Sequence, residues 1–462
     1  MSKHTKHTSK FLTVSVAALC AAGMAPAMAQ DDASEDVITV TGFRASLAEA
    51  LDVKKQSTAA VDAIVADDIA DFPDQNLAEA LGRIPGVAIT RERGEGREIT
   101  VRGLGGEYTR VRINGMESIA STNGNRGRGF DFNIFASELF SNIIVRKTAT
   151  ADVDEGSLGA VVDLNTGRPF DFGAGTTFAV NGQAQYNDLN EEMAPRLSGL
   201  FAYTNPEETF GVSLSAALSD YETELETQNT VRWQKSRFAS VGGEDCTVTP
   251  EPADCATVTG AWHPRIPRYG VQTESRDRLG LTGGLQFKPS DKTIVTVDAL
   301  YSTYEASRAE IYGEVLFRGN EGGMDVVDYT YDPDLNLLTS MTVNNAWVRN
   351  EYFENLWTTD FTQLSAGIEH EFTDRLRVNG MVGTSKSKTD REYELTFMYD
   401  DRDYNGYFYD YSDDEEPVLA FNGPDVSDPA NFQMTELRDR PEQIEHGFDT
   451  ADFEVEGDIF DN

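Results

Sequence analysis

From residue 175 onward, apolar and polar residues alternate in a series of segments about ten residues long. In Thr177–Tyr186, for example, the even-numbered positions include Phe178, Val180 and Tyr186, and the odd-numbered positions include Asn181 and Gln185. Successive side chains of a strand point to opposite faces, so each segment predicts a strand with one apolar and one polar face. The clear segments are 177–186, 210–219, 279–287 and 451–459, and the weaker ones are 197–204, 295–303, 362–372 and 376–384.

The connections between these segments alternate in length. Those at 205–209, 289–293 and 373–375 are tight turns, whereas most of the others run to dozens of residues. Short turns on one side and long loops on the other are typical of an outer-membrane barrel, while a soluble sandwich would distribute loop length more evenly. The sequence therefore predicts a transmembrane β-barrel, apolar toward lipid and polar toward a wet lumen.

The charge of the chain is strongly acidic but unevenly distributed. There are 39 Lys and Arg against 78 Asp and Glu, a net charge of −39, which excludes nucleic acid as the main partner. Aromatic residues make up 10%, too many for a disordered polyanion. Residues 83–150, however, hold eleven basic and seven acidic side chains. This asymmetry predicts a separate N-terminal unit.

The first 29 residues have the organisation of a signal peptide. Lys3, Lys6 and Lys10 precede an apolar run over 11–22, and Ala27-Met28-Ala29 supplies small residues before a cleavage site. We expect cleavage before Gln30 and export of the mature chain without an anchor.

The unit that follows reads as a small mixed α/β domain. Asp36–Gly42 predicts an extended strand, either an ordinary edge strand or one that pairs with another protein. Short helices are expected at 64–69 and 77–84, the second capped by Asn76 with Glu79 completing a capping box. Further strands are expected at 87–91, 99–102, 111–114, 143–146 and 160–164.

Five short motifs occur in a fixed order along this unit, and together they resemble the plug domain of TonB-dependent outer-membrane receptors. They are Asp36–Gly42, Asn76–Val87, Ile99–Gly103, Val111–Gly115 and Ile143–Lys147 with Gly156–Leu164. The resemblance implies a TonB box at Asp36, Val37, Ile38, Thr39, Val40, Thr41 and Gly42. It implies plug-motif positions at Arg102, Gly103, Arg112, Asn114 and Gly115. Asn114-Gly115 replaces the usual Asp-Gly, and this change preserves hairpin-turn chemistry.

The resemblance and the strand count together predict a domain plan. Residues 30–50 form a periplasmic segment with the TonB box, 51–170 form the plug, and 175–462 form the first part of the barrel. Eight strands enclose a lumen that their own side chains fill, whereas a lumen that holds a plug needs about 22 strands. We therefore expect about eight strands here and a chain that is a piece of a longer receptor.

Three groups of residues are candidates for sites. Cys246 and Cys255 are expected to form a disulfide in an oxidising compartment, with two free thiols as the alternative. A loop rich in Tyr and Asp could be an acidic surface with an aromatic rim, a sugar-stacking site or a Ca²⁺ site. Plug arginines are expected to pair with lumen carboxylates such as those on the last strand, or to contact an anionic substrate. The proposed ligand contacts are Arg126, Arg128, Tyr404, Tyr407, Tyr409, Tyr411 and Asp410.

The expected function is transport rather than catalysis. No arrangement of catalytic side chains, metal ligands or nucleotide-binding residues is apparent, so neither an enzyme nor a cofactor is predicted. The resemblance implies residence in the outer membrane of a Gram-negative cell, contact with its lipid, and energy supplied by TonB and its inner-membrane complex. The Arg- and Gly-rich plug motifs resemble a carbohydrate-linked proteobacterial branch, which predicts an oligosaccharide ligand. A ferric siderophore is the alternative ligand, and a signalling receptor or an adhesin is the alternative function.

Overall fold

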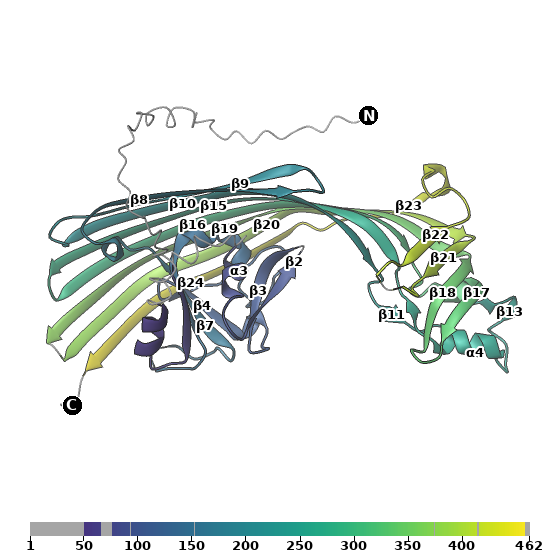
Figure 1. Ribbon diagram of the computed structural model, residues 1–462, viewed down its shortest axis with the longest axis horizontal. Helices are drawn as coiled ribbons and strands as arrows, with labels where there is room; N and C mark the ends of the chain where they lie inside the picture. The colour runs from purple at the N-terminus through teal and green to yellow at the C-terminus, as the bar shows by residue number, and fades with distance from the viewer. Residues whose placement is uncertain are drawn as a thin grey trace, which may run out of the picture. The chain divides into compact units, whose positions relative to one another are not determined.

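The computed structural model describes residues 50–65, 76–92, 94–151, 153–373, 375–413 and 415–457. The expected signal peptide, the TonB box at Asp36–Gly42 and Arg93 lie outside the described residues. The described elements form three groups, which we call the plug, the wall and the loop sheet (Figure 1).

The plug is a mixed α/β unit, as predicted. Its main sheet has the order β1-β6-β7-β4-β5, in which β4 and β7 are parallel and the other neighbours antiparallel. Ile64, expected in a helix, instead lies in β1, and residues 50–56 form a helix that the sequence analysis missed. The bounds are β1 Val61–Val65, α3 Leu77–Leu81, β2 Val87–Glu92, β3 Glu95–Val101, β4 Thr109–Ile113, β5 Met116–Glu117, β6 Phe140–Arg146 and β7 Ala160–Thr166.

The N-terminal cap of α3 explains where this short helix begins. The Asn76 side chain accepts hydrogen bonds from the backbone N–H groups of Ala78 (2.9 Å) and Glu79 (3.3 Å). The predicted capping box is wrong in its second half, because the Glu79 carboxylate binds the Arg91 guanidinium and the Gly96 N–H instead. The helix is therefore tied to the β2–β3 hairpin from its first turn.

Two tight turns in the plug require left-handed backbone. Asn114 and Gly115 have φ values of 52° and 87°, and Arg102 and Gly103 have 54° and 80°. These pairs of positive angles suit two-residue turns, in which Asn and Gly are the favoured residues. Asn114 also ties the turn to β7 through hydrogen bonds to Thr166. The predicted Asn-Gly turn is confirmed.

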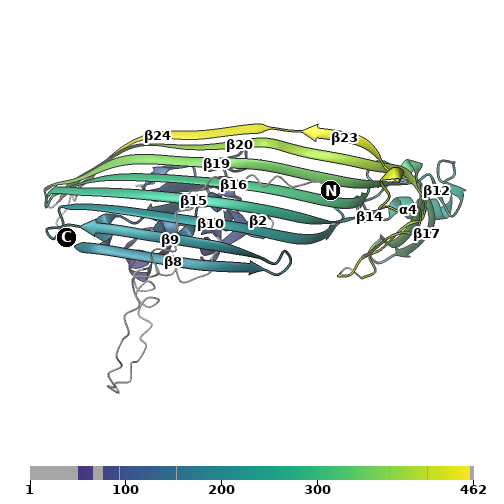
Figure 2. The same ribbon diagram turned by 90° about the horizontal axis from the view of Figure 1, so that it is seen from above.

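The wall is a nine-stranded antiparallel sheet, in which β23 and β24 both pair with β20. Seen from above, its long strands lie side by side in the order β8, β9, β10, β15, β16, β19 and β20 (Figure 2). The predicted fold class, a plug followed by antiparallel strands of a barrel, is confirmed. The bounds are β8 Gly175–Asn187, β9 Glu192–Thr204, β10 Phe210–Asn229, β15 Arg268–Ser290, β16 Thr293–Val315, β19 Ala346–Thr373, β20 Leu376–Tyr404, β23 Gln433–Asp439 and β24 Glu442–Gly457.

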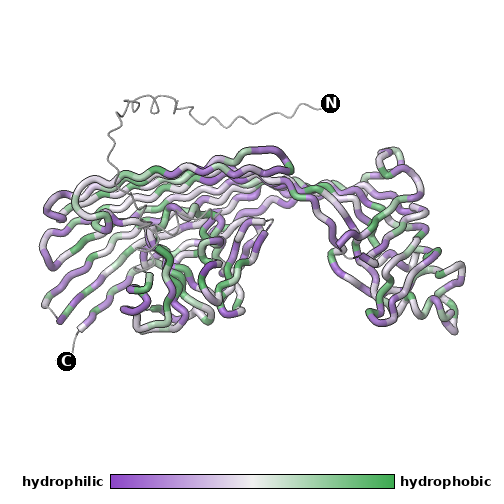
Figure 3. The backbone as a smooth tube through the Cα atoms, viewed as in Figure 1, coloured by the Kyte–Doolittle hydropathy of each residue, from purple (hydrophilic) through white to green (hydrophobic). Residues whose placement is uncertain are grey.

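Several wall strands extend well past the segments that alternation predicts. β19 has 28 residues and β20 has 29, whereas alternation marks about ten in each. Beyond those segments polar residues interrupt the more apolar face, as Thr223 and Thr227 do in Tyr221–Thr227 of β10, so the alternation is weaker. Figure 3 shows apolar and polar residues interspersed along the wall strands. Backbone pairing continues because it depends on main-chain groups and not on an apolar face.

Three long connections between wall strands fold together into the loop sheet, which the sequence analysis did not predict. Its order is β13-β12-β17-β18-β21-β22, and a disulfide joins Cys246 to Cys255, as expected. The connection between β10 and β15 also forms the β11–β14 pair. The bounds are β11 Trp233–Gln234, β12 Ser240–Val241, β13 Glu244–Asp245, α4 Ala253–Gly260, β14 His263–Pro264, β17 Asp325–Asp332, β18 Leu337–Asn344, β21 Tyr407–Asp410 and β22 Val418–Phe421.

Short 3₁₀ helices complete the secondary structure. They are η2 Gly106–Tyr108, η3 Phe132–Ile134, η4 Ser137–Leu139, η5 Pro169–Phe172, η6 Glu321–Gly323 and η7 Pro429–Asn431. Among the described residues, no helix has the length and apolar character needed to cross a membrane.

Two hydrophobic cores hold these parts. The first fills the plug and continues into the wall through residues such as Trp357 and Phe361. The second fills the loop sheet with residues from all three connections, among them Phe238, Phe317 and Tyr407. The plug is therefore packed against the wall, while the loop sheet has a core of its own.

Candidate functional site between plug and wall

One part of the plug–wall contact consists of polar side chains of the wall that bind plug backbone. Gln363 donates to the Ile113 carbonyl at 2.8 Å, and Ser302 donates to the Ile134 carbonyl at 2.8 Å. Thr389 donates to the Ser121 carbonyl at 2.5 Å. A net hydrogen bond of this kind contributes about 1 kcal/mol, because water replaces it when the partners separate. Such contacts position the plug and can be exchanged for water one at a time.

A smaller apolar contact lies in the same interface. The Phe135 ring meets the Phe361 ring edge to face, with centroids 5.0 Å apart. Leu139 packs directly over Gly280 of β15, so closely that a side chain at that glycine would require Leu139 to move. The close approach places the η3–η4 segment directly on the wall.

A buried ion cluster is the strongest charged contact between the two parts. Glu95, the first residue of β3, lies 2.8 Å from Arg278 Nη2 and 3.3 Å from Arg276 Nη1. The three residues are only 4–7% exposed. Both arginines project from β15 into the lumen, as alternate residues of one strand do. Removing one partner of such a buried cluster leaves an uncompensated charge, which is strongly destabilising.

The surroundings of Glu95 favour its ionised form. Burial raises the pKa of this carboxyl, but Arg278, Arg276 and the Asn76 amide oppose burial and lower the pKa below its ordinary value. Asn76 donates to Glu95 Oε1 at 2.8 Å while its oxygen caps α3. Asn76 therefore links α3 to Glu95 of the β2–β3 hairpin, and Glu95 in turn binds the wall.

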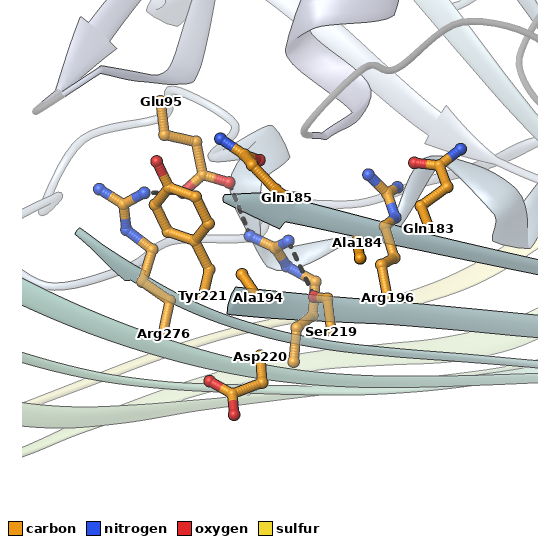
Figure 4. A pocket seen from close by; sticks show the side chains of 11 residues that line it. Glu95, Gln183, Ala184, Gln185, Ala194, Arg196, Ser219, Asp220, Tyr221 and Arg276 are labelled. Carbon is orange, nitrogen blue, oxygen red and sulfur yellow. Dashed lines mark hydrogen bonds and ion pairs between the residues drawn. The ribbon is translucent and has the colours of Figure 1, made fainter. Parts of the chain in front are cut away.

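The cluster borders a cavity of about 520 Å³ between the plug and the β8–β10 and β15 strands. Figure 4 shows Glu95 reaching from the plug toward Arg276, beside the ring of Tyr221. Gln183, Gln185 and Arg196 line the other side. Three wall arginines, Arg196, Arg276 and Arg278, therefore line this cavity.

The expected pairing of plug arginines with wall carboxylates is mostly wrong. Arg126 does bind Glu442 on β24 and Arg168 binds Asp298 on β16, but most of the paired plug arginines bind carboxylates within the plug. Arg128 is exposed. The wall instead supplies arginines to plug carboxylates, as in the Arg196–Glu138 pair and the Glu95 cluster. The pairs within the plug are Arg91–Glu79, Arg97–Asp131, Arg110–Glu117, Arg112–Asp163 and Arg146–Asp163.

The tyrosines predicted to contact a ligand form part of a core instead. Tyr404, Tyr407 and Tyr409 are at most 1% exposed and pack inside the loop sheet. Tyr411 and Asp410 are partly buried beside them. Their stretch is rich in acidic residues and looks exposed in the sequence, but hydrophobic residues from two other connections cover it. A ligand surface on these tyrosine faces is therefore not present.

Glu95, Arg276 and Arg278 are not among the site residues predicted from the sequence. The sequence does indicate the two arginines, because they lie two residues apart immediately before the segment 279–287. They are in phase with its polar residues, which face the lumen. Their counter-ion could not be found this way, because it lies in another domain. No group of three or more His, Cys, Asp or Glu residues suited to a metal ion is found in the described ranges.

Comparison with known proteins identifies the N-terminal domain. Residues 53–161 match the family model described as the TonB-dependent Receptor Plug Domain. A curated relative, "Ferric enterobactin receptor PirA" of Pseudomonas aeruginosa, is 32% identical over 155 residues, which are 30% of this chain and 20% of that protein. The chain thus contains a TonB-dependent receptor plug domain, with homology to a siderophore receptor.

Solved receptors resemble the chain weakly. The Q482A mutant of the ferric enterobactin receptor PfeA of Pseudomonas aeruginosa is 13% identical to this chain. The match covers 75% of this chain and 62% of the receptor, with a TM-score of 0.31. The siderophore receptor PirA of Acinetobacter baumannii is 12% identical, with 78% and 60% covered and a TM-score of 0.30. These TM-scores are too low to carry a functional inference.

Proposed function

We propose that the chain is part of a TonB-dependent outer-membrane receptor that imports a scarce ligand and is not an enzyme. The match of residues 53–161 to the plug family carries this proposal. The docking of that plug on a long antiparallel wall supports it. By the family resemblance, TonB would engage Asp36–Gly42 and draw on the energy of the inner membrane.

The plug–wall interface suits a plug that stays bound to the wall until TonB displaces it. Its hydrogen bonds from Gln363, Ser302 and Thr389 can be taken over by water as the plug moves. The buried Glu95 cluster resists that motion more strongly, because separation leaves charges in a poorly hydrated space. A pull on the N-terminal segment would therefore need to break this cluster.

A ferric siderophore is the ligand we favour. The support is the 32% identity with a protein described as a ferric enterobactin receptor. The prediction of an oligosaccharide rests on the Arg- and Gly-rich plug motifs, and a sugar-stacking site on the Tyr-rich loop would support it. The buried positions of Tyr404, Tyr407 and Tyr409 remove that support. An oligosaccharide remains the ligand to test against.

The test uses the full-length receptor in an outer membrane. Cells with the intact receptor should take up an iron-loaded siderophore in an energy-dependent manner, and deletion of residues 36–42 should abolish uptake while leaving surface binding intact. Undiminished uptake after the deletion would refute TonB-driven transport. Energised uptake of oligosaccharides alone would keep the transport mechanism and replace the ligand.

A further inference from the structure

Three arginines lie on neighbouring, hydrogen-bonded backbone segments, and none of them forms an ion pair with a described carboxylate. Arg232 and Arg265 lie directly opposite each other, because Arg265 N–H donates to the Arg232 carbonyl at 2.8 Å in continuation of the β11–β14 register. Arg318 N–H donates in turn to the Arg265 carbonyl at 3.2 Å. The three backbones are thereby fixed side by side.

This arrangement is unfavourable for the protein alone. Like charges directly opposite each other on paired strands repel. Partial burial and the charges of Arg232 and Arg318 lower the pKa of Arg265, and the Glu321 carboxylate opposes this shift without cancelling it. Across the ranges that the structure describes, no carboxylate lies within ion-pairing distance of these three guanidinium groups, although acidic residues outnumber basic ones by 78 to 39.

The local backbone holds the cluster in place. Val231 has a φ of +62°, which a β-branched residue rarely adopts, and Arg232 N–H donates to the Thr230 carbonyl at 2.6 Å across this turn. Asn229 supports the turn by accepting from Val231 N–H at 3.2 Å and from Arg268 at 2.9 Å. Arg232 and Arg318 are exposed, so their guanidinium groups are accessible.

We propose that Arg232, Arg265 and Arg318 form a binding site for a multiply charged oxyanion. Guanidinium groups match the paired oxygens of phosphate and carboxylate groups, and a bound anion would relieve the repulsion among them. Two sources could supply this chemistry: phosphate groups of a surrounding lipid, or a soluble anion that enters from outside. The inference does not rest on the proposed transport function, because binding alone tests it.

The experiment titrates the full-length receptor, in detergent, with pyrophosphate as the probe. Arg265→Gln should weaken binding about tenfold, the loss expected for one charge-assisted contact. Arg377→Gln, which removes an exposed arginine paired with Glu371 at the opposite end of the wall, should leave binding unchanged. Without anion, Arg265→Gln should melt no lower than the parent, because it removes repulsion.

Other outcomes decide against the site or identify its source. Absence of pyrophosphate binding, or equal weakening by Arg265→Gln and Arg377→Gln, would overturn the proposal. A lower melting temperature with unchanged binding would also overturn it, by showing a structural role. Should Arg265→Gln not fold, the exposed Arg318→Gln replaces it with the same expectation. Displacement of pyrophosphate by lipopolysaccharide would support a lipid source, and displacement by citrate alone would support a soluble one.

Discussion

The plug and the loop sheet each have a hydrophobic core, but the chain builds the two cores in different ways. The plug core comes mainly from residues 64–164, with a few wall residues packed against it. The loop-sheet core joins segments as far apart as Phe238, Phe317 and Tyr409. The first is nearly local in sequence, whereas the second exists only once the wall has brought three connections together. Stability in the loop sheet should therefore depend on different bonds from those that hold the plug.

The largest expected effect concerns the plug. Glu95→Gln keeps the size of the side chain but removes the carboxylate that binds Arg278 and leaves Arg276 paired with Glu274. We expect a loss of about 3–5 kcal/mol in the free energy of unfolding of the plug, measured by denaturant titration of the full-length receptor. The control Asp52→Asn removes an exposed carboxylate paired with Lys55 and should cost less than about 1 kcal/mol. Equal effects would show that the cluster is not the main anchor.

The second prediction concerns the disulfide, which is confined to the loop sheet. Replacing both Cys246 and Cys255 by Ser opens a loop with a sequence separation of 9. Loop-closure entropy for this length corresponds to about 3 kcal/mol. Hydrogen exchange should accelerate in β12 and β17 and remain unchanged in β4 and β7 of the plug. Parallel acceleration in both regions would mean that the two cores unfold as one unit.

A pH effect should also distinguish the two regions. Burial lowers the pKa of His263 in the loop sheet to about 4. Between its ordinary value near 6.5 and about 4, the unfolded chain binds more protons than the folded one, so stability is complete above pH 6.5 and falls as pH falls. The expected loss by pH 4 is about 3 kcal/mol.

Glu321 complicates this pH dependence. Its carboxyl lies 3.9 Å from His263 Nε2, and burial raises its pKa, which acts in the opposite sense. The difference in the pH dependence of stability between the parent receptor and His263→Gln isolates the contribution of the histidine, because both proteins contain Glu321. Hydrogen exchange in β14 and β18, measured as a function of pH, gives this difference. An identical pH profile for the two proteins would contradict a buried neutral His263.

The same contrast explains what could be predicted from the sequence. Wall strands were found because one face is apolar over about ten residues, and the plug was found because its motifs are contiguous. The strand extensions are harder to predict because polar residues interrupt their more apolar face. The loop sheet was missed because its pairings, such as Ser240 with Asp325 and Val343 with Tyr407, join residues that no local pattern relates. Arg276 and Arg278 were visible as a lumen pair, but Glu95 became their partner only through tertiary packing.

The smallest effect separates two buried tyrosines of the loop-sheet core. Tyr409 donates a hydrogen bond to the Leu338 carbonyl at 3.3 Å, whereas the Tyr407 hydroxyl is buried without a partner among the described residues. Tyr409→Phe should therefore lower stability by about 1 kcal/mol, while Tyr407→Phe should be neutral or raise it by a similar amount, because it removes an unsatisfied hydroxyl. Both substitutions retain the ring that fills the core. Thermal unfolding of the two variants against the parent measures the difference. Equal losses of stability would mean that the Tyr407 hydroxyl has a hydrogen-bond partner. A loss of ligand binding in both variants without any change in stability would instead show that Tyr407 and Tyr409 contact the ligand.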